Sequence, residues 1–135
     1  MRKVLPDGGV ALGALLDGLA AEGPLPAEVT ERFERLRGLT ARLGRAATGR
    51  ADLPYWVADD YLRAVALVLL EWAWAQIGAA RPHRAEQSTA ATDRWTPPAQ
   101  AFAQWVLPEF DLRTTILRQR IAQAFEFRPQ EAASA

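Results

Sequence analysis

The sequence has no cysteine, and it has one histidine and one methionine among its 135 residues. The absence of cysteine excludes disulfides, thiolate catalysis and cysteine-ligated metal sites. His83 has no second histidine at ligand spacing, so we predict no metal site. Ser88 lies in no GxSxG motif, and one serine with one histidine is a weak basis for nucleophilic catalysis. We therefore assign no catalytic, metal-binding or cofactor-binding residue to this chain.

A net charge is also absent, because 16 basic residues balance 16 acidic residues. A chain without a global electric field has no general attraction to nucleic acid or to an anionic membrane, and we expect neither as a partner. The N-terminal sequence MRKVLPDGG becomes polar before any apolar run of signal-peptide length. We expect a protein that is not exported and that resides in the cytoplasm.

The most apolar stretch is residues 55–80, YWVADDYLRAVALVLLEWAWAQIGAA. From Ala64 to Ala80 the only charged residue is Glu71. A helix that is apolar nearly all round is normally buried, so we predict a central helix that two or three neighbours cover. A membrane span is the alternative, but the apolar run from Ala64 to Ala80 is shorter than the roughly 20 apolar residues that a span needs, and Glu71 lies near its middle. We predict no membrane span.

Three further segments have apolar residues at helical spacing. The first reaches about Ala21, with Asp7 as candidate N-cap, and the second extends from Pro26 to about Ala47. The last begins at Thr96 and reaches about Phe127, and Pro108 should kink or break it. Its expected inner face is Phe102, Trp105, Val106, Phe110, Leu117, Ile121, Ala124 and Phe125. We expect a mobile loop over residues 81–95.

Four helices with fairly short connections predict an all-α, up-down four-helix bundle. We assign residues 1–127 to this single domain and residues 128–135 to a disordered tail. The glycines near residue 8 match no phosphate-binding motif, and we interpret them as the start of the first helix.

Four residues are candidates for interactions with a partner: Glu71, Trp74, Arg42 and Arg45. A buried Glu71 needs a partner or a raised pKa, and an arginine from another helix or another chain would supply the partner. A general-base role for Glu71 is a weaker alternative. Trp74 is one of five tryptophans that could anchor an interface.

The second helix has an excess of arginines, which include Arg42 and Arg45. These side chains could form a docking patch for an acidic surface or a phosphate, although a solvated helix face is the default interpretation. On the same helix, two glutamate–arginine pairs at i,i+4 spacing should stabilise the helix: Glu28 with Arg32, and Glu31 with Arg35. The adjacent Asp59 and Asp60 point about 100° apart and make a poor carboxylate dyad, so we interpret them as negative charge near a helix N-terminus.

Three stretches, RKVLPDGGVALGALL, YLRAVALVLLEWAWAQIGAA and AFAQWVLPE, carry a resemblance to a known family. Together they resemble the extra C-terminal helical domain of one branch of bacterial acyl-CoA dehydrogenases. The resemblance covers roughly residues 2–127 and rests on packing residues, among them Tyr61, Trp72 and Trp105. The chain departs from the family pattern at two places. Thr96-Pro97-Pro98 shortens the segment before the last aromatic residues, and Glu71 stands where the family pattern has a small or apolar residue.

The resemblance implies a parent enzyme that uses FAD to desaturate acyl-CoA thioesters, with its glutamate base and flavin contacts outside the region present here. We therefore expect a noncatalytic helical module that braces an acyl-CoA dehydrogenase core or its subunit contacts, with FAD only in that parent enzyme. Two alternatives remain open. One is a free-standing helical protein that self-associates, and the other is a small ligand-binding bundle that uses Glu71 and the arginines.

Overall fold

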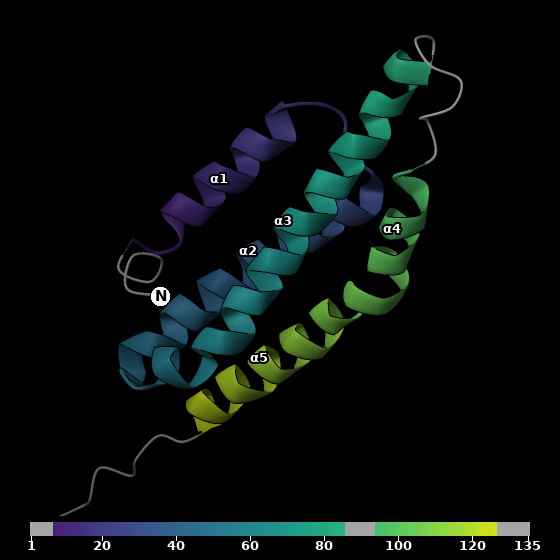
Figure 1. The fold of residues 1–135 in the computed structure, drawn as a ribbon. Coiled ribbons are helices and arrows are strands. Elements are labelled where there is room, and N and C mark those ends of the chain that lie inside the picture. Colours follow the sequence, from purple (N-terminus) through teal and green to yellow (C-terminus); the bar gives the residue numbers. More distant parts are fainter. Residues whose placement is uncertain (1–6, 86–93, 127–135) are drawn as a thin grey trace, which may run out of the picture.

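The computed structural model describes residues 7–85 and 94–126, without the side chains of residues 81–85. Its helices are α1 (Val10–Ala21), α2 (Ala27–Gly49), α3 (Leu53–Ala85), α4 (Thr96–Ala101), the π-helical turn η1 (Phe102–Val106) and α5 (Glu109–Glu126). Figure 1 shows that α4, η1 and α5 follow one another as a single bent helix, and that the four helices alternate in direction. The predicted all-α four-helix bundle is confirmed.

The start of α1 depends on Asp7 and on two glycines. The Asp7 carboxylate accepts hydrogen bonds from the backbone N–H groups of Gly9 (2.8 Å) and Ala11 (3.0 Å). Gly8 and Gly9 have positive φ angles of 67° and 84°, which glycine adopts without steric cost. A Cβ atom on Gly9 would also lie 2.8 Å from the Thr40 Cγ2 atom. Gly9 is the N-cap residue, but the Asp7 carboxylate satisfies free N–H groups from just outside the helix.

The core lies where α3 packs against α2 and α5. On α3, Val57, Tyr61, Ala64 and Val68 recur at intervals of three or four residues, and each is at most 1% exposed. Inside this interface the Tyr61 hydroxyl lies 2.8 Å from the Thr40 hydroxyl, which donates a hydrogen bond to the Leu36 carbonyl oxygen. Because Thr40 uses its proton there, Tyr61 is the donor to Thr40. Burial raises the pKa of Tyr61.

The prediction that two or three neighbours bury the central helix is only partly right, because one side of α3 stays exposed. Leu62 is 55% exposed and Leu70 is 48% exposed, and only 22% of the most apolar 18-residue window of α3 is buried. The reason is the arrangement of the neighbours: α2 and α5 cover one side of α3, while α1 packs chiefly on α2. In Figure 1, α3 lies in front of α2, between α1 and α5.

The segment Leu53–Ala80 of α3 is long and apolar enough to cross a membrane by length and composition, and its most apolar 18 residues have a mean hydropathy of 1.3. The core helix of a bundle can pass the same test, so the absence of a span stays a prediction. The helix also continues to Ala85, beyond the predicted end at Ala80. Pro82 in its last turn lacks only one backbone donor, and this loss does not end the helix. The predicted loop therefore begins later than Arg81.

The last helix bends at residues 107–108, as predicted from Pro108. The Leu107 N–H donates to the Phe102 carbonyl oxygen at 2.8 Å, an i→i+5 bond that forms the π-helical turn ahead of the proline. The extra residue in this turn rotates the chain, and Trp105 is 81% exposed while Val106 is 41% exposed. Both were expected on the inner face, and so was Phe125, which is 55% exposed. The buried members of the predicted face are Phe102, Phe110, Leu117 and Ile121.

The predicted tail, residues 128–135, lies outside the described residues, as do Ser88 and the side chain of His83. Thr96, ahead of two prolines, predicts a cap for the last helix, but the N-cap residue is Trp95, and Thr96 is the first helical residue. Asp52, in the connector ahead of the central apolar stretch, is a candidate cap for α3 by its residue type and position. Its carboxylate instead accepts hydrogen bonds from the side chains of Arg50 and Trp56.

Candidate functional site

Glu71 forms an ion pair between α2 and α3. The Arg32 Nη1 atom lies 2.5 Å from the Glu71 Oε1 atom, and the two side chains are 21% and 12% exposed. Arg32 also donates to the backbone carbonyl oxygen of Glu28 at 3.4 Å. Glu71 thus has the arginine partner that its burial required, and the partner belongs to another helix.

The ion pair leaves Glu71 incompletely satisfied. Its second carboxylate oxygen, Oε2, is buried and has no hydrogen-bond partner among the described residues. The pKa of Glu71 is raised, because burial penalises the charged form more than Arg32 stabilises it, and the nearby Glu28 raises the pKa further. The ion pair with Arg32 gives Glu71 a structural role between two helices. Because one carboxylate oxygen is buried without a partner, the ionised form of Glu71 lowers the stability of the fold at neutral pH.

The two i,i+4 ion pairs predicted on α2 do not form. Arg32 pairs with Glu71, and Arg35 pairs with Asp111 of α5, with 2.9 Å between its Nη1 atom and the Asp111 Oδ1 atom. Both arginines lie on the part of α2 that faces other helices. They therefore connect helices instead of stabilising one helix locally.

A second cluster of charges connects α3 and α5. The Arg113 guanidinium lies 2.7 Å from both the Asp60 and the Glu109 carboxylates, and Arg63 lies 3.1 Å from Glu109. The pKa of Glu109 is lowered, chiefly by its hydrogen bond from Arg113. Asp60 is only 8% exposed, so its role is this ion pair between helices and not the N-terminal charge that we predicted from the sequence.

Trp74 packs against the core of the bundle. Its ring centroid lies 6.4 Å from that of Phe102, with the planes tilted by 37°, so it connects α3 to η1. The side chain is half-buried against the core. The tryptophans that are most exposed are Trp56, at 65%, and Trp105, at 81%. Trp105 is exposed because it lies in the π-helical turn. The sequence carries no signal for that turn, so it could not show that Trp105 would be more exposed than Trp74.

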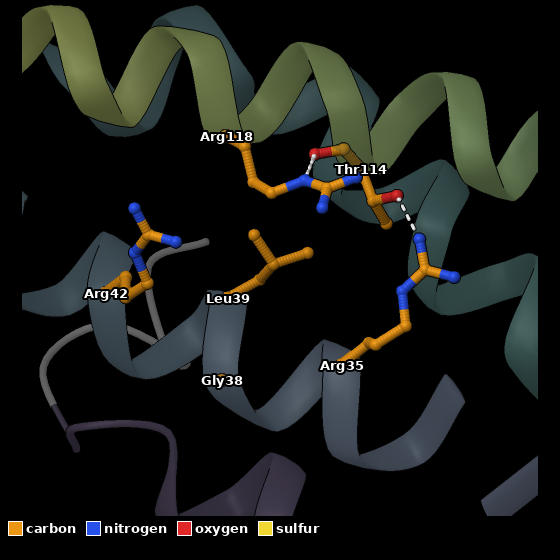
Figure 2. A pocket seen from close by; sticks show the side chains of 6 residues that line it. All are labelled: Arg35, Gly38, Leu39, Arg42, Thr114 and Arg118. Atoms are coloured by element: carbon orange, nitrogen blue, oxygen red, sulfur yellow. Dashed lines mark hydrogen bonds between the residues drawn. The ribbon is translucent and has the colours of Figure 1, made fainter. Parts of the chain in front are cut away.

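Arg42 lines a cavity, whereas Arg45 does not. The cavity has a volume of about 170 Å³ and lies between α2 and α5. Its lining residues are Arg35, Gly38, Leu39, Arg42, Thr114 and Arg118. Figure 2 shows Arg35, Leu39 and Arg42 on α2, with Thr114 and Arg118 on α5 opposite them. Arg45 lies one turn further along α2 and is exposed.

The sequence singled out Arg42 and missed Arg118. Arg35 and Arg42 are seven residues apart and so share one face of α2, and this spacing was a usable signal. The position of Arg118 depends on how α5 packs against α2, which no local pattern encodes. The four predicted residues thus lie apart: Glu71 is in an ion pair, Trp74 is half-buried against the core, Arg42 lines the cavity, and Arg45 is exposed outside it.

The outer face of α3 carries an apolar stripe formed by Leu62, Ala66 and Leu70. Leu62 and Leu70 are about half exposed, and Ala66 is also exposed. Each of these residues is four positions from the next, so their side chains are neighbours on the helix surface. We call them the outer stripe. Arg63 and Asp59, both exposed, lie beside its N-terminal end.

Within the residues that the structure describes, no three histidine, cysteine, aspartate or glutamate side chains form a group that could hold a metal ion. Comparison with known protein families, curated proteins and solved structures gives no match. The resemblance to the acyl-CoA dehydrogenase C-terminal domain therefore stays a prediction from the three sequence stretches.

Proposed function

We propose that this chain is a noncatalytic helical docking module that braces an acyl-CoA dehydrogenase core, either in the same polypeptide or in trans. The observation that carries the proposal is the outer stripe of α3, because an apolar helix face left uncovered by its own bundle is typical of a surface that another protein covers. The resemblance of residues 2–127 supplies the identity of the partner. FAD and the catalytic base would belong to that partner.

Burial of the outer stripe by a partner would stabilise the complex, because its leucines are apolar and exposed. Burying a leucine side chain completely contributes about 1.5–3 kcal/mol, and Leu62 and Leu70 are each about half exposed. Covering both would therefore add about 2 kcal/mol to an association. Arg63 and Asp59 beside the stripe would provide the polar rim that interfaces usually have.

The ion pairs between helices support a bracing role. Arg32–Glu71 connects α3 to α2, and Arg113–Asp60 connects α3 to α5. Both pairs resist rotation of α3 about its axis, because rotation would separate partners that are partly buried. The outer stripe is thus presented in a fixed direction, as a docking surface requires.

Photo-crosslinking in the native host tests the proposal. A photoreactive amino acid replaces Leu62 or Leu70 in the stripe, and Arg45, exposed on α2, serves as the control position. We expect both stripe positions, and not position 45, to cross-link to a flavin-containing acyl-CoA dehydrogenase that mass spectrometry identifies. Cell fractionation should recover the same complex without membrane extraction.

Three outcomes would contradict the proposal. Cross-links from the stripe to a second copy of this chain alone would establish self-association in place of a dehydrogenase partner. Recovery of the chain only in the membrane fraction would show that Leu53–Ala80 spans a bilayer. Flavin binding and thioester oxidation by the purified chain itself would show that the module is an enzyme.

A further inference from the structure

The cavity between α2 and α5 has a concentration of positive charge. Three of its six lining residues are arginines: Arg35, Arg42 and Arg118. One carboxylate, that of Asp111, pairs with Arg35, and no other acidic side chain of the described residues lies within ion-pair distance of these three arginines. Three positive charges less one negative charge leave a net charge of +2 at the cavity.

Arg35 is held firmly in place. It donates to Asp111 at 2.9 Å and to the Thr114 hydroxyl at 3.1 Å, and its guanidinium carbon lies 5.1 Å from the centroid of the Phe110 ring. Thr114 is fully buried. Arg35 therefore acts as a fixed positive charge at one end of the cavity.

Arg42 and Arg118 have donors to spare. Arg118 gives its Nε proton to the Thr114 carbonyl oxygen at 3.3 Å and one Nη2 proton to the Thr115 hydroxyl at 3.4 Å, which leaves N–H groups of its guanidinium unused within the described residues. Arg42 and Arg118 extend from opposite helices on either side of Leu39 (Figure 2). Leu39, only 6% exposed, is the apolar side chain among the lining residues.

We propose that this cavity binds a phosphate group as its dianion, with Arg42 and Arg118 as direct ligands and Arg35 as the supporting charge. Guanidinium groups bind phosphate oxygens in bidentate geometry, and two arginines from facing helices can hold one phosphate between them. The net charge of +2 matches a phosphate dianion better than a single carboxylate. The exposed positions of Arg42 and Arg118 leave the phosphate accessible from solvent.

A phosphate of this kind could belong to a soluble phosphomonoester or to a lipid headgroup. The recognition chemistry is the same for both sources, because only the terminal phosphate enters a cavity of about 170 Å³. The experiment therefore includes inorganic phosphate, a soluble phosphomonoester such as glycerol phosphate, and phosphatidylcholine vesicles with and without phosphatidic acid.

Isothermal titration at fixed ionic strength tests the site in the purified full chain. We expect saturable binding of inorganic phosphate, and a weakening of at least about tenfold in Arg42→Gln and in Arg118→Gln, since each loses a charge-assisted bidentate contact. Arg45→Gln is the matched control, because it removes the same charge from the same face of α2 outside the cavity. Acetate should bind more weakly than phosphate in all four proteins.

Equal weakening in Arg45→Gln would overturn the proposal, because it would show diffuse attraction to a basic face. Phosphate binding that is unchanged in Arg42→Gln and Arg118→Gln, or that never saturates, would also overturn it. Circular dichroism verifies that each exposed substitution leaves the helices intact. Tighter binding to phosphatidic acid vesicles than to glycerol phosphate would assign the lipid source, and the reverse order would assign the soluble source.

Discussion

The ion pair between Arg32 and Glu71 gives the sharpest test of the structure, because its two halves should respond differently to removal. Arg32→Met keeps the aliphatic stem but leaves the Glu71 carboxylate buried without a cation. Glu71→Leu removes the carboxylate and leaves Arg32, which is 21% exposed and retains its bond to the Glu28 carbonyl oxygen. We expect the first variant to lose stability and the second to lose little.

The magnitudes follow from burial. Removing one partner of a fully buried pair costs about 3–5 kcal/mol, because the remaining charge is unpaired. With side chains that are 21% and 12% exposed, solvent screens part of this cost, and we expect Arg32→Met to lose about 2 kcal/mol. In Glu71→Leu the orphan oxygen and the desolvation cost disappear together, so the free energy of unfolding should change by less than about 1 kcal/mol in either direction.

Urea denaturation followed by circular dichroism measures both free energies of unfolding, and the double variant completes the cycle. We expect the double variant to be nearer to the wild type than Arg32→Met is, because it contains no uncompensated buried charge. Equal losses of stability in the two single variants would refute the reasoning. Such a result would mean that burying the Glu71 carboxylate costs no more than the ion pair with Arg32 returns. A larger loss in Glu71→Leu than in Arg32→Met would refute it as well.

The same residue predicts a pH dependence with a defined sign. The native pKa of Glu71 is raised above the unfolded value, so the native state binds the proton more tightly than the unfolded state. Its contribution to stability is complete below the unfolded-state pKa, about 4.3, and is lost as the pH rises through the native pKa. The stability of the wild type relative to Glu71→Gln should therefore fall as the pH rises over this window. A relative stability that rises with pH would contradict this sign.

Two further measurements test other contacts. Tyr61→Phe removes a buried hydrogen bond to Thr40, which keeps its own bond to the backbone, and should lower the free energy of unfolding by about 1 kcal/mol in urea denaturation. An unchanged free energy of unfolding would show that this hydrogen bond does not stabilise the fold. The pKa of Asp52 is about 2, chiefly because Arg50 donates hydrogen bonds to its carboxylate, and in Arg50→Gln it should rise toward its ordinary value. Carbon-detected NMR titration of the Asp52 carboxyl group measures this, and an unchanged value would show that Arg50 is not the cause.

Much of the fold could be predicted from the sequence. The helical spacing of apolar residues on α3 predicts a buried stripe, formed by Val57, Tyr61, Val65, Val68, Leu69 and Trp72. Val57, Tyr61 and Val68 are buried, and the other three are half-buried. The bend at Pro108 followed from the missing backbone donor of proline. These features depend on residues within one or two turns of each other, so the sequence alone contains the information.

The candidate sites could be predicted only in part. The low polarity of Glu71's surroundings indicated an arginine partner from elsewhere, but the sequence could not identify Arg32. The choice of Arg42 from the basic face of α2 placed one ligand of the proposed phosphate site, while Arg118 and the structural role of Trp74 were missed. Each miss concerns a residue whose surroundings come from a different helix.

The sequence by itself determined which segments are helical, where the last helix bends and which residues could form a core. The tertiary structure alone decided which side of α3 faces outward, because a helix that is apolar nearly all round has no polar face to mark its exposed side. It also decided that Arg42 and Arg118, from two different helices, line one cavity. The rotation and offset of packed helices set such distances, and these depend on how side chains from separate segments fit together.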